Sequence, residues 1–313
     1  MKKFWVGALV TLCMPAFAQA AVAASPLPVV TSFSILGDMV REVGGDDVHV
    51  TVIVPPLGDP HTFEPSPKDA RALGAAKVLV VNGLGFESWM PRLIQASGFG
   101  GLKIVASQGV HARELKDDDS GNEHEILAPA HAAVKGGTLD PHAWQDLSNG
   151  MLYVQNIAGG LSQADPTHAA AYEARAQAYV ARLKTADTQW REQLASVPSD
   201  RRVLATSHDA FGYFGAAYGI RVLSVVGVSS EAEPSARVMA DLVRQIRKHH
   251  IRALFLEHGS NTRAMNQIAA ETGVKIGGEL FADTLDTPGH KASTYLGMFR
   301  WNTGLLLKAF TAQ

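Results

Sequence analysis

The 313-residue sequence has very little cysteine: Cys13 is the only one. A single cysteine cannot form an intramolecular disulfide, and it cannot supply a zinc site built from several thiolates, as in zinc fingers. Any metal must therefore be held by histidine and carboxylate side chains. The chain also lacks an excess of positive charge, because its formal net charge is -2. This balance provides no basic footprint for nucleic acid, so no nucleic-acid partner is expected.

Long hydrophobic runs are absent as well, and none reaches the roughly 18 residues that a membrane-spanning helix needs. The N-terminus carries Lys2 and Lys3, a short apolar run over 4–12, and small-residue cleavage motifs within 18–23. This layout is typical of a secretory signal peptide, and we assign residues 1–23 to it. The alternative is a short buried N-terminal helix.

Cys13 lies inside this predicted signal peptide. It could serve as a lipid attachment site, which is the alternative to free release. Leu12 directly before it is larger than the small residue expected there, and the apolar run is short. We therefore favour cleavage and release, which leaves a mature chain without a thiol.

The rest of the chain has the composition of a globular protein, with 46% hydrophobic and 19% charged residues. Short β-branched runs alternate with helical segments, which predicts right-handed βαβ units and doubly wound parallel sheets. The fold class is therefore α/β. The predicted strands are 29–33, 48–54, 78–81 and 102–106 in the first half, and 202–206, 220–226, 253–256 and 274–280 in the second half.

A long segment without helix breakers separates the two halves. Residues 165–197 begin with Asp165-Pro166, an N-cap and first-turn pair, and carry apolar residues at steps of three or four. We interpret this segment as a helix of about 45 Å that links two α/β lobes, 24–164 and 198–313. A coiled-coil dimer seam is the alternative, although its few repeats contain many alanines.

Two copies of the triplet Asp-Pro-His are the most informative motif in the sequence. His61 lies in the stretch 58–67, which follows the predicted strand 48–54, and His142 lies in the second copy, 140–142. Aspartate before proline disfavours helix, and the prolines stiffen each turn by fixing φ. Each turn therefore presents an imidazole on a rigid loop, which suits metal binding.

The second half supplies two further candidates at strand ends. His208 follows the strand 202–206, and Asp283 lies beyond the strand 274–280. Ligands bind at the carboxyl edge of parallel sheets, so all four side chains can face one cleft between the lobes. Asp283 is the least certain of the four, because it could instead cap its turn, and Asp286 is a close competitor.

Three imidazoles and one carboxylate form a tetrahedral N/O set that suits Zn²⁺. Mn²⁺ prefers more oxygen ligands and lies lower in the affinity order. A fourth protein ligand closes the site, which favours carrying a metal over catalysis with it. Glu257, also at a strand end, is either a ligand or an outer partner of an imidazole, whereas Glu64 is expected to serve its own loop.

The other histidines have no evident ligand partner. His124 and His131 lie in a polar, acidic segment, 113–137, which is either a solvated surface loop or a weak metal-collecting loop. The remaining ones are expected to be structural: His49, His111, His168, His249, His250, His258 and His290.

These motifs together resemble the metal-binding receptors of ABC importers for zinc and manganese. The resemblance covers essentially the whole mature chain, and the motifs are 58–67, 140–144, 207–214, 231–235 and 281–283. It implies two α/β lobes joined by a rigid helix, small domain motions, and metal ligands at His61, His142, His208 and Asp283. In such receptors, members with glutamate at the third ligand position tend to import manganese. His208 occupies that position here and favours zinc.

We therefore expect a monomeric periplasmic receptor that binds Zn²⁺ and delivers it to an ABC transporter permease, and not an enzyme. A manganese receptor is the first alternative. A secreted zinc hydrolase is the second, and it would need an open coordination position with Glu257 as general base. A surface adhesin has no positive feature in the sequence.

Overall fold

The computed structural model describes residues 25–115, 139–226, 234–249 and 251–312. The predicted signal peptide, His124, His131 and His250 lie outside these residues. The N-terminal lobe contains β1 (Leu27–Phe33), α1 (Ser34–Gly44), β2 (Val48–Val54), α2 (Pro67–Ala75), β3 (Val78–Val81), α3 (Met90–Ser97), β4 (Leu102–Val105) and α4 (Leu147–Ala164). The C-terminal lobe contains β5 (Val203–His208), α6 (Gly212–Tyr218), β6 (Arg221–Val226), α7 (Ala236–Lys248), β7 (Ala253–Glu257), α8 (Arg263–Thr272) and β8 (Lys275–Leu280).

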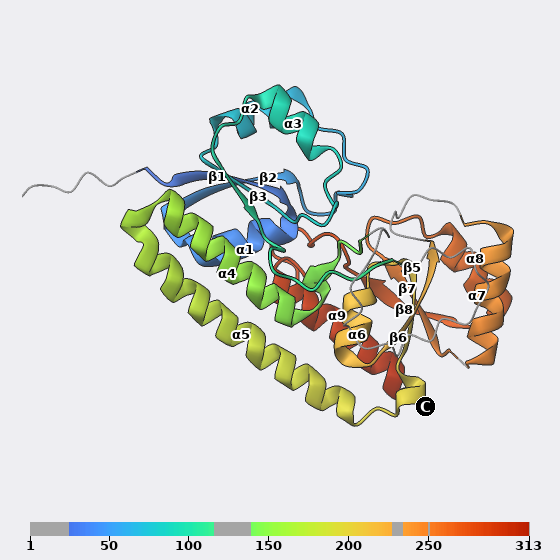
Figure 1. The fold of residues 1–313 in the computed structure, drawn as a ribbon. Coiled ribbons are helices and arrows are strands. Elements are labelled where there is room, and N and C mark those ends of the chain that lie inside the picture. Colours follow the sequence, from blue (N-terminus) through green and yellow to red (C-terminus); the bar gives the residue numbers. More distant parts are fainter. Residues whose placement is uncertain (1–24, 116–138, 227–233, 250, 313) are drawn as a thin grey trace, which may run out of the picture.

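The sheet of the N-terminal lobe has the strand order β2-β1-β3-β4, and every neighbouring pair is parallel. The inner strand β3 is a continuous apolar run, Val78–Val81, in which every residue is buried. This pattern is expected where helices cover both faces of a parallel sheet. Helices α2 and α3 lie on one face, and α1 and α4 lie on the other (Figure 1).

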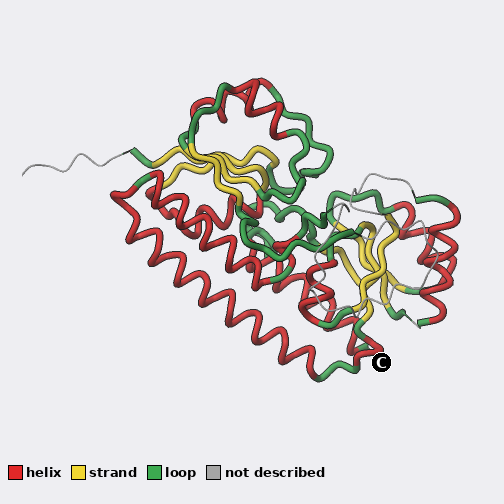
Figure 2. The backbone as a smooth tube through the Cα atoms, in the orientation of Figure 1, coloured by secondary structure: helices red, strands yellow, loops and turns green. Residues whose placement is uncertain are grey.

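The C-terminal lobe follows the same plan with two parallel pairs, β5-β6 and β7-β8. Strand β5 lies beside β7, so the four strands form one layer (Figure 2). Helices α7 and α8 cover its outer face, whereas α6 and α9 (Tyr295–Thr311) lie on the side of the rest of the molecule. The predicted α/β class with two lobes is confirmed.

Helix α5 (Ala169–Ala195), with 27 residues, is the predicted linking helix. It runs along the lower side of the molecule from one lobe to the other (Figure 1). Its apolar face packs on α4, α1 and α9, so this face is not available for a coiled-coil partner. The residues of that face are buried: Tyr172, Ala176, Tyr179, Leu183, Trp190 and Leu194.

Three local predictions are wrong in instructive ways. Ser34 does not cap α1, because its hydroxyl accepts the backbone N–H of Leu285 instead. Asp165 does not cap the long helix directly, because a 3-10 turn, Pro166–His168, precedes α5 and its carboxylate binds His168 and Tyr172. His208 is the last residue of β5 instead of following the strand. Helix α3 was not predicted at all.

A buried carboxylate joins the start of the fold to its last helix. Asp38 on α1 accepts the backbone N–H of Tyr295, the first residue of α9, at 2.8 Å. Burial raises the pKa of Asp38 to about 6, although this hydrogen bond acts in the opposite direction. The folded state therefore holds this proton more tightly than the unfolded chain does.

We predict that this group makes the stability of the metal-free protein depend on pH. Because its pKa is raised, Asp38 stabilises the folded state by about 3 kcal/mol below about pH 4. This contribution is lost as the pH rises through about 6. Asp38→Asn keeps an acceptor for Tyr295 but cannot ionise. Its stability relative to wild type, measured by urea unfolding, should increase between pH 4 and pH 7. The exposed Asp46→Asn is the control, and an equal pH response in both variants would contradict the assignment.

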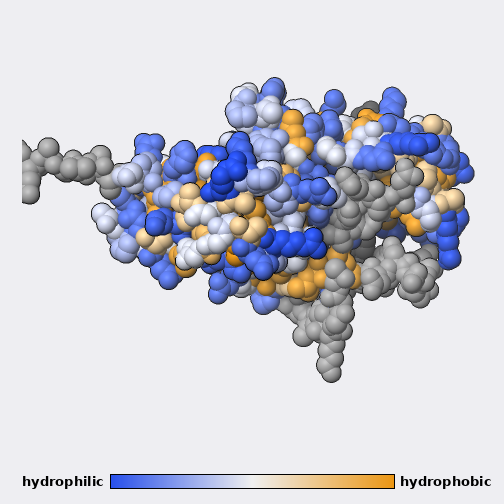
Figure 3. Space-filling view, turned by 90° about the horizontal axis from the view of Figure 1, so that it is seen from above, coloured by the Kyte–Doolittle hydropathy of each residue, from blue (hydrophilic) through white to orange (hydrophobic). Residues whose placement is uncertain are grey.

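Helices long and apolar enough to cross a membrane do not occur in the described part of the chain. Seen from above, the visible face carries hydrophilic residues interspersed with smaller apolar patches (Figure 3).

Candidate metal centre

The four side chains predicted to bind metal meet between the two lobes. His61 lies on the loop after β2, His142 immediately precedes a 3-10 turn (Ala143–Gln145), His208 ends β5, and Asp283 follows β8. Each offers one ligand atom, and these atoms all lie within 4.8 Å of one another. Among the described residues, this is the only cluster of three or more histidine, cysteine or acidic residues that could hold a metal ion.

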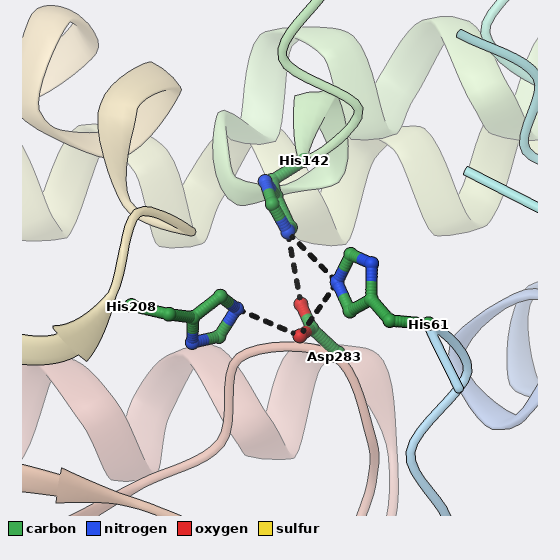
Figure 4. Close-up of side chains that lie close together, drawn as sticks. All are labelled: His61, His142, His208 and Asp283. Atoms are coloured by element: carbon green, nitrogen blue, oxygen red, sulfur yellow. Dashed lines mark hydrogen bonds and ion pairs between the residues drawn. The ribbon is translucent and has the colours of Figure 1, made fainter. Parts of the chain in front are cut away.

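The Asp283 carboxylate lies at the centre of this cluster (Figure 4). Its Oδ2 is 3.0 Å from Nε2 of His208 and 3.3 Å from Nε2 of His61, and its Oδ1 is 3.5 Å from Nε2 of His142. The Nε2 atoms of His61 and His142 are 3.3 Å apart. All three imidazoles therefore direct the same ring nitrogen toward one point, which gives a donor set of three nitrogens and one oxygen.

Asp286, the competing carboxylate, is not part of the cluster. It accepts the backbone N–H of Thr287 and lies 3.6 Å from Nδ1 of His290. The described histidines that were expected to be structural also lie outside the cluster. His258, for example, stacks on Phe281 and contacts Glu279.

The cluster is largely removed from water. The side chains of His142 and His208 are 0% and 2% exposed, whereas those of His61 and Asp283 are each 10% exposed. The ring of Phe86 contacts the His61 ring edge-on, with ring centroids 4.8 Å apart, and the ring centroids of Trp144 and His142 are 5.4 Å apart. The centre is therefore accessible to solvent chiefly beside His61 and Asp283.

An aspartate orients the imidazole of His142. Oδ1 of Asp140 accepts the backbone N–H of His142 at 3.0 Å and lies 2.8 Å from its Nδ1. A carboxylate at Nδ1 favours the tautomer with its proton on that nitrogen, which leaves the lone pair of Nε2 for a metal. Arg113 approaches the other oxygen of Asp140 at 3.8 Å, and Tyr213 of α6 donates its hydroxyl to the Asp140 carbonyl.

Glu257 has the same relation to His208. Its Oε1 accepts the backbone N–H of His208 at 2.9 Å, and its Oε2 lies 2.5 Å from Nδ1 of the ring. Glu257 is 1% exposed and ends β7, next to β5. Glu257 therefore contacts the ring nitrogen of His208 that faces away from the four-residue cluster, which is the position of an outer partner.

The charges at the centre are strongly coupled. Burial on its own lowers the pKa of His208, but the carboxylates of Glu257 and Asp283 outweigh it and hold that pKa well above the usual value. Burial raises the pKa of Asp283, but the imidazoles of His208 and His142 outweigh it and hold that pKa well below the usual value. Without metal, the centre is therefore held together by attraction between these groups.

Sequence reasoning missed the loop that supports Phe86. Glu87 is buried, and it accepts hydrogen bonds from the Ser32 hydroxyl and from the backbone N–H groups of Asn82 and Gly83. Burial raises the pKa of Glu87. The available signal was an acidic residue within a glycine-rich segment directly after the apolar strand β3.

Known proteins resemble this chain in both sequence and fold. A family model described as the periplasmic component A of the zinc-uptake complex, ZnuA, matches residues 29–309. The chain belongs to this family. ZnuA-family proteins are solute-binding receptors of ABC metal importers that work with a membrane permease, and this chain is such a metal-binding receptor.

Two similar proteins are named for manganese. This ZnuA-family chain is 33% identical over 276 residues to the manganese-binding lipoprotein MntA of Halalkalibacterium halodurans, covering 88% of this chain and 86% of that protein. It is 32% identical over 288 residues to the manganese-binding lipoprotein MntA of Bacillus subtilis, covering 90% and 89%.

Solved structures of periplasmic metal-binding proteins share the fold of this chain. The fold matches the periplasmic zinc-binding protein TroA from Treponema pallidum with a TM-score of 0.81 and 29% identity, covering 92% of this chain and 100% of that one. It matches the Mn-bound periplasmic metal-binding protein from Candidatus Liberibacter asiaticus with a TM-score of 0.79 and 26% identity, covering 90% and 98%. The family and the two-lobe fold are therefore established.

Proposed function

We propose that this chain captures Zn²⁺ in the periplasm and delivers it to the permease of an ABC importer, with His61, His142, His208 and Asp283 as the four ligands. The observation that carries the proposal is the convergence of three Nε2 atoms and one carboxylate. A receptor needs only to hold and release its cargo, so no enzymatic activity is proposed.

The spacing of these atoms supports zinc. A tetrahedral ion with bonds of 2.0–2.1 Å places its ligand atoms about 3.3 Å apart. With Oδ2 as the bound oxygen of Asp283, three pairs of ligand atoms are separated by 3.0 to 3.3 Å, and the four ligand atoms all lie within 4.8 Å of one another. These three pairs already have the separation that a bound zinc ion requires.

Manganese is the second candidate, because several similar proteins are named for it. Mn²⁺ prefers more oxygen than this cluster supplies with one bound carboxylate oxygen. His208 provides nitrogen at a position where a carboxylate would suit Mn²⁺ better. The donor set thus favours zinc over manganese.

The hydrolase alternative receives less support. It requires Glu257 to act as a base beside an open metal position, but the carboxylate of Glu257 lies at Nδ1 of His208, on the side of the ring away from the other ligands. Glu257 would have to leave this buried position to reach a metal-bound water.

A competition titration tests the proposed cargo. The metal-free mature protein is titrated with Zn²⁺ against a chelator of known affinity, and with Mn²⁺ in parallel. We expect one equivalent of tightly bound zinc and much weaker manganese. Comparable manganese binding would contradict the preference for zinc, and the absence of tight binding by either metal would contradict the site itself.

We further propose that residues 1–23 are cleaved, that the lobes comprise 24–164 and 198–313 with 165–197 between them, and that the mature protein is a released monomer. Similar proteins include named lipoproteins, so the mass of the mature chain is informative. A lipid on Cys13 would contradict release.

A further inference from the structure

The segment that carries Asp283 is fastened to the N-terminal lobe, although it follows β8 of the C-terminal lobe. The carbonyl of Ala282 accepts two side-chain hydrogen bonds, from Nε2 of Gln145 at 2.7 Å and from Nε1 of Trp144 at 2.9 Å. Both donors are buried and follow His142 closely in the chain. One short stretch of the N-terminal lobe therefore holds both His142 and the residue before Asp283.

The residues that follow Asp283 are bound to the same lobe. The backbone N–H of Leu285 donates to the hydroxyl of Ser34 on α1 at 3.0 Å. Leu57, from the loop of His61, donates its N–H to the Thr284 hydroxyl at 2.8 Å and to the Leu285 carbonyl at 3.2 Å. Hydrogen bonds to the N-terminal lobe thus stand on both sides of Asp283.

Apart from the contact of the Asp283 carboxylate with His208, the bonds of this segment toward the C-terminal lobe among the described residues lie before Asp283. The backbone of Phe281 is bound by the side chain of Asn302 on α9, and the Leu280 carbonyl accepts the N–H of His258 after β7. His208, by contrast, is an integral part of β5 and is held by Glu257 of β7. Only His208 among the four residues is fixed to the C-terminal sheet.

We propose that Gln145 is a positioning residue for Asp283. Its hydrogen bond to the Ala282 carbonyl keeps the Asp283 carboxylate beside His61 and His142. The inference rests on the proposed function of the cluster as a metal site. A change in the angle between the lobes then displaces His208 from the other three ligands. Metal exchange accordingly proceeds through a state in which the N-terminal lobe keeps three ligands and His208 has withdrawn.

Gln145 is a better test of this idea than Trp144. The Trp144 ring also packs on Phe33 and Phe86, with ring centroids 5.0 and 4.9 Å away, so its replacement would disturb the core. Gln145 meets Ala282 through an amide N–H, and a carbonyl can only accept. Gln145→Met preserves the length and volume of the side chain but removes the donor.

The experiment compares Gln145→Met with Gln245→Met, which makes the same substitution on α7 in the outer part of the C-terminal lobe. Bound Co²⁺ reports ligand geometry through its visible absorption, and a chelator chase with Zn²⁺ gives the release rate. Loss of one hydrogen bond predicts release roughly two- to tenfold faster. We expect this change and an altered Co²⁺ spectrum for Gln145→Met only, with thermal unfolding of both metal-free variants close to wild type.

Several results would overturn the proposal. One is a Gln145→Met protein with the wild-type Co²⁺ spectrum and release rate, whether or not its metal-free form is less stable. Another is an equal change in Gln245→Met. Failure of the wild-type protein to bind Co²⁺ or Zn²⁺ would instead refute the proposed function, and the positioning role with it. The wild-type titration therefore separates the two failures.

Discussion

His208→Ala should reduce zinc affinity by about a thousandfold or more while the metal-free protein stays folded. Loss of an outer partner of a ligand costs roughly 10- to 100-fold, and loss of the ligand itself should cost more. The β5 strand is held by backbone pairing with β6, so the fold does not depend on the imidazole. A chelator competition titration measures the affinity, and circular dichroism with thermal unfolding checks the fold.

Two further variants make this result interpretable. His49→Ala changes an exposed histidine on β2 and should bind zinc like the wild type. His61→Ala removes the most exposed of the three imidazoles, so it carries the least risk to folding and should also bind zinc weakly. Unchanged zinc affinity in both ligand variants would show that the cluster is not the metal site.

Glu257→Gln should weaken zinc binding roughly 10- to 100-fold, because it changes the tautomer of His208. The glutamine carbonyl can still accept the backbone N–H of His208, which the Oε1 atom of Glu257 accepts at 2.9 Å. Its amide N–H₂ then faces Nδ1, where two donors cannot coexist. The proton is therefore expected to move to Nε2, which removes the lone pair that faces the metal.

The same variant separates the receptor from the hydrolase. A general base beside an open metal position could be lost with little change in metal affinity, whereas an outer partner of His208 could not. Glu271→Gln, on the surface of α8, is the matched control and should bind zinc normally. Wild-type zinc affinity in Glu257→Gln would contradict the role assigned to this carboxylate. Isothermal or chelator titration provides the measurement.

The sequence already contained most of the architecture. Continuous apolar strands alternating with helices predict parallel sheets, and the breaker-free run after Pro166 predicts the linking helix. These features are local, because they depend on the period of the hydrophobic pattern. Sequence reasoning did not find α3, which has only eight residues and lies between segments that contain glycines, nor the 3-10 turn before α5.

The four candidate ligands were also accessible from sequence. Proline fixes the turn in both Asp-Pro-His triplets, and strand ends place His208 and Asp283 at the same edge of their sheet. Sequence spacing could not decide between Asp283 and Asp286, because three residues of irregular chain can direct either carboxylate inward. In the structure it is Asp283 that contacts the three imidazoles.

Tertiary structure decided which residues hold the candidate ligands in place, although Glu257 was already a candidate outer partner from the sequence. The sequence determined that this chain has two α/β lobes, a rigid connection and histidines on stiff loops, because each follows from short-range pattern and chain stiffness. It could not determine that Gln145 would donate a hydrogen bond to Ala282, 137 residues away, or that the Ser34 hydroxyl would accept the Leu285 N–H instead of capping α1. Such hydrogen bonds join segments that meet only after both lobes have packed, and no local pattern encodes which segments will meet.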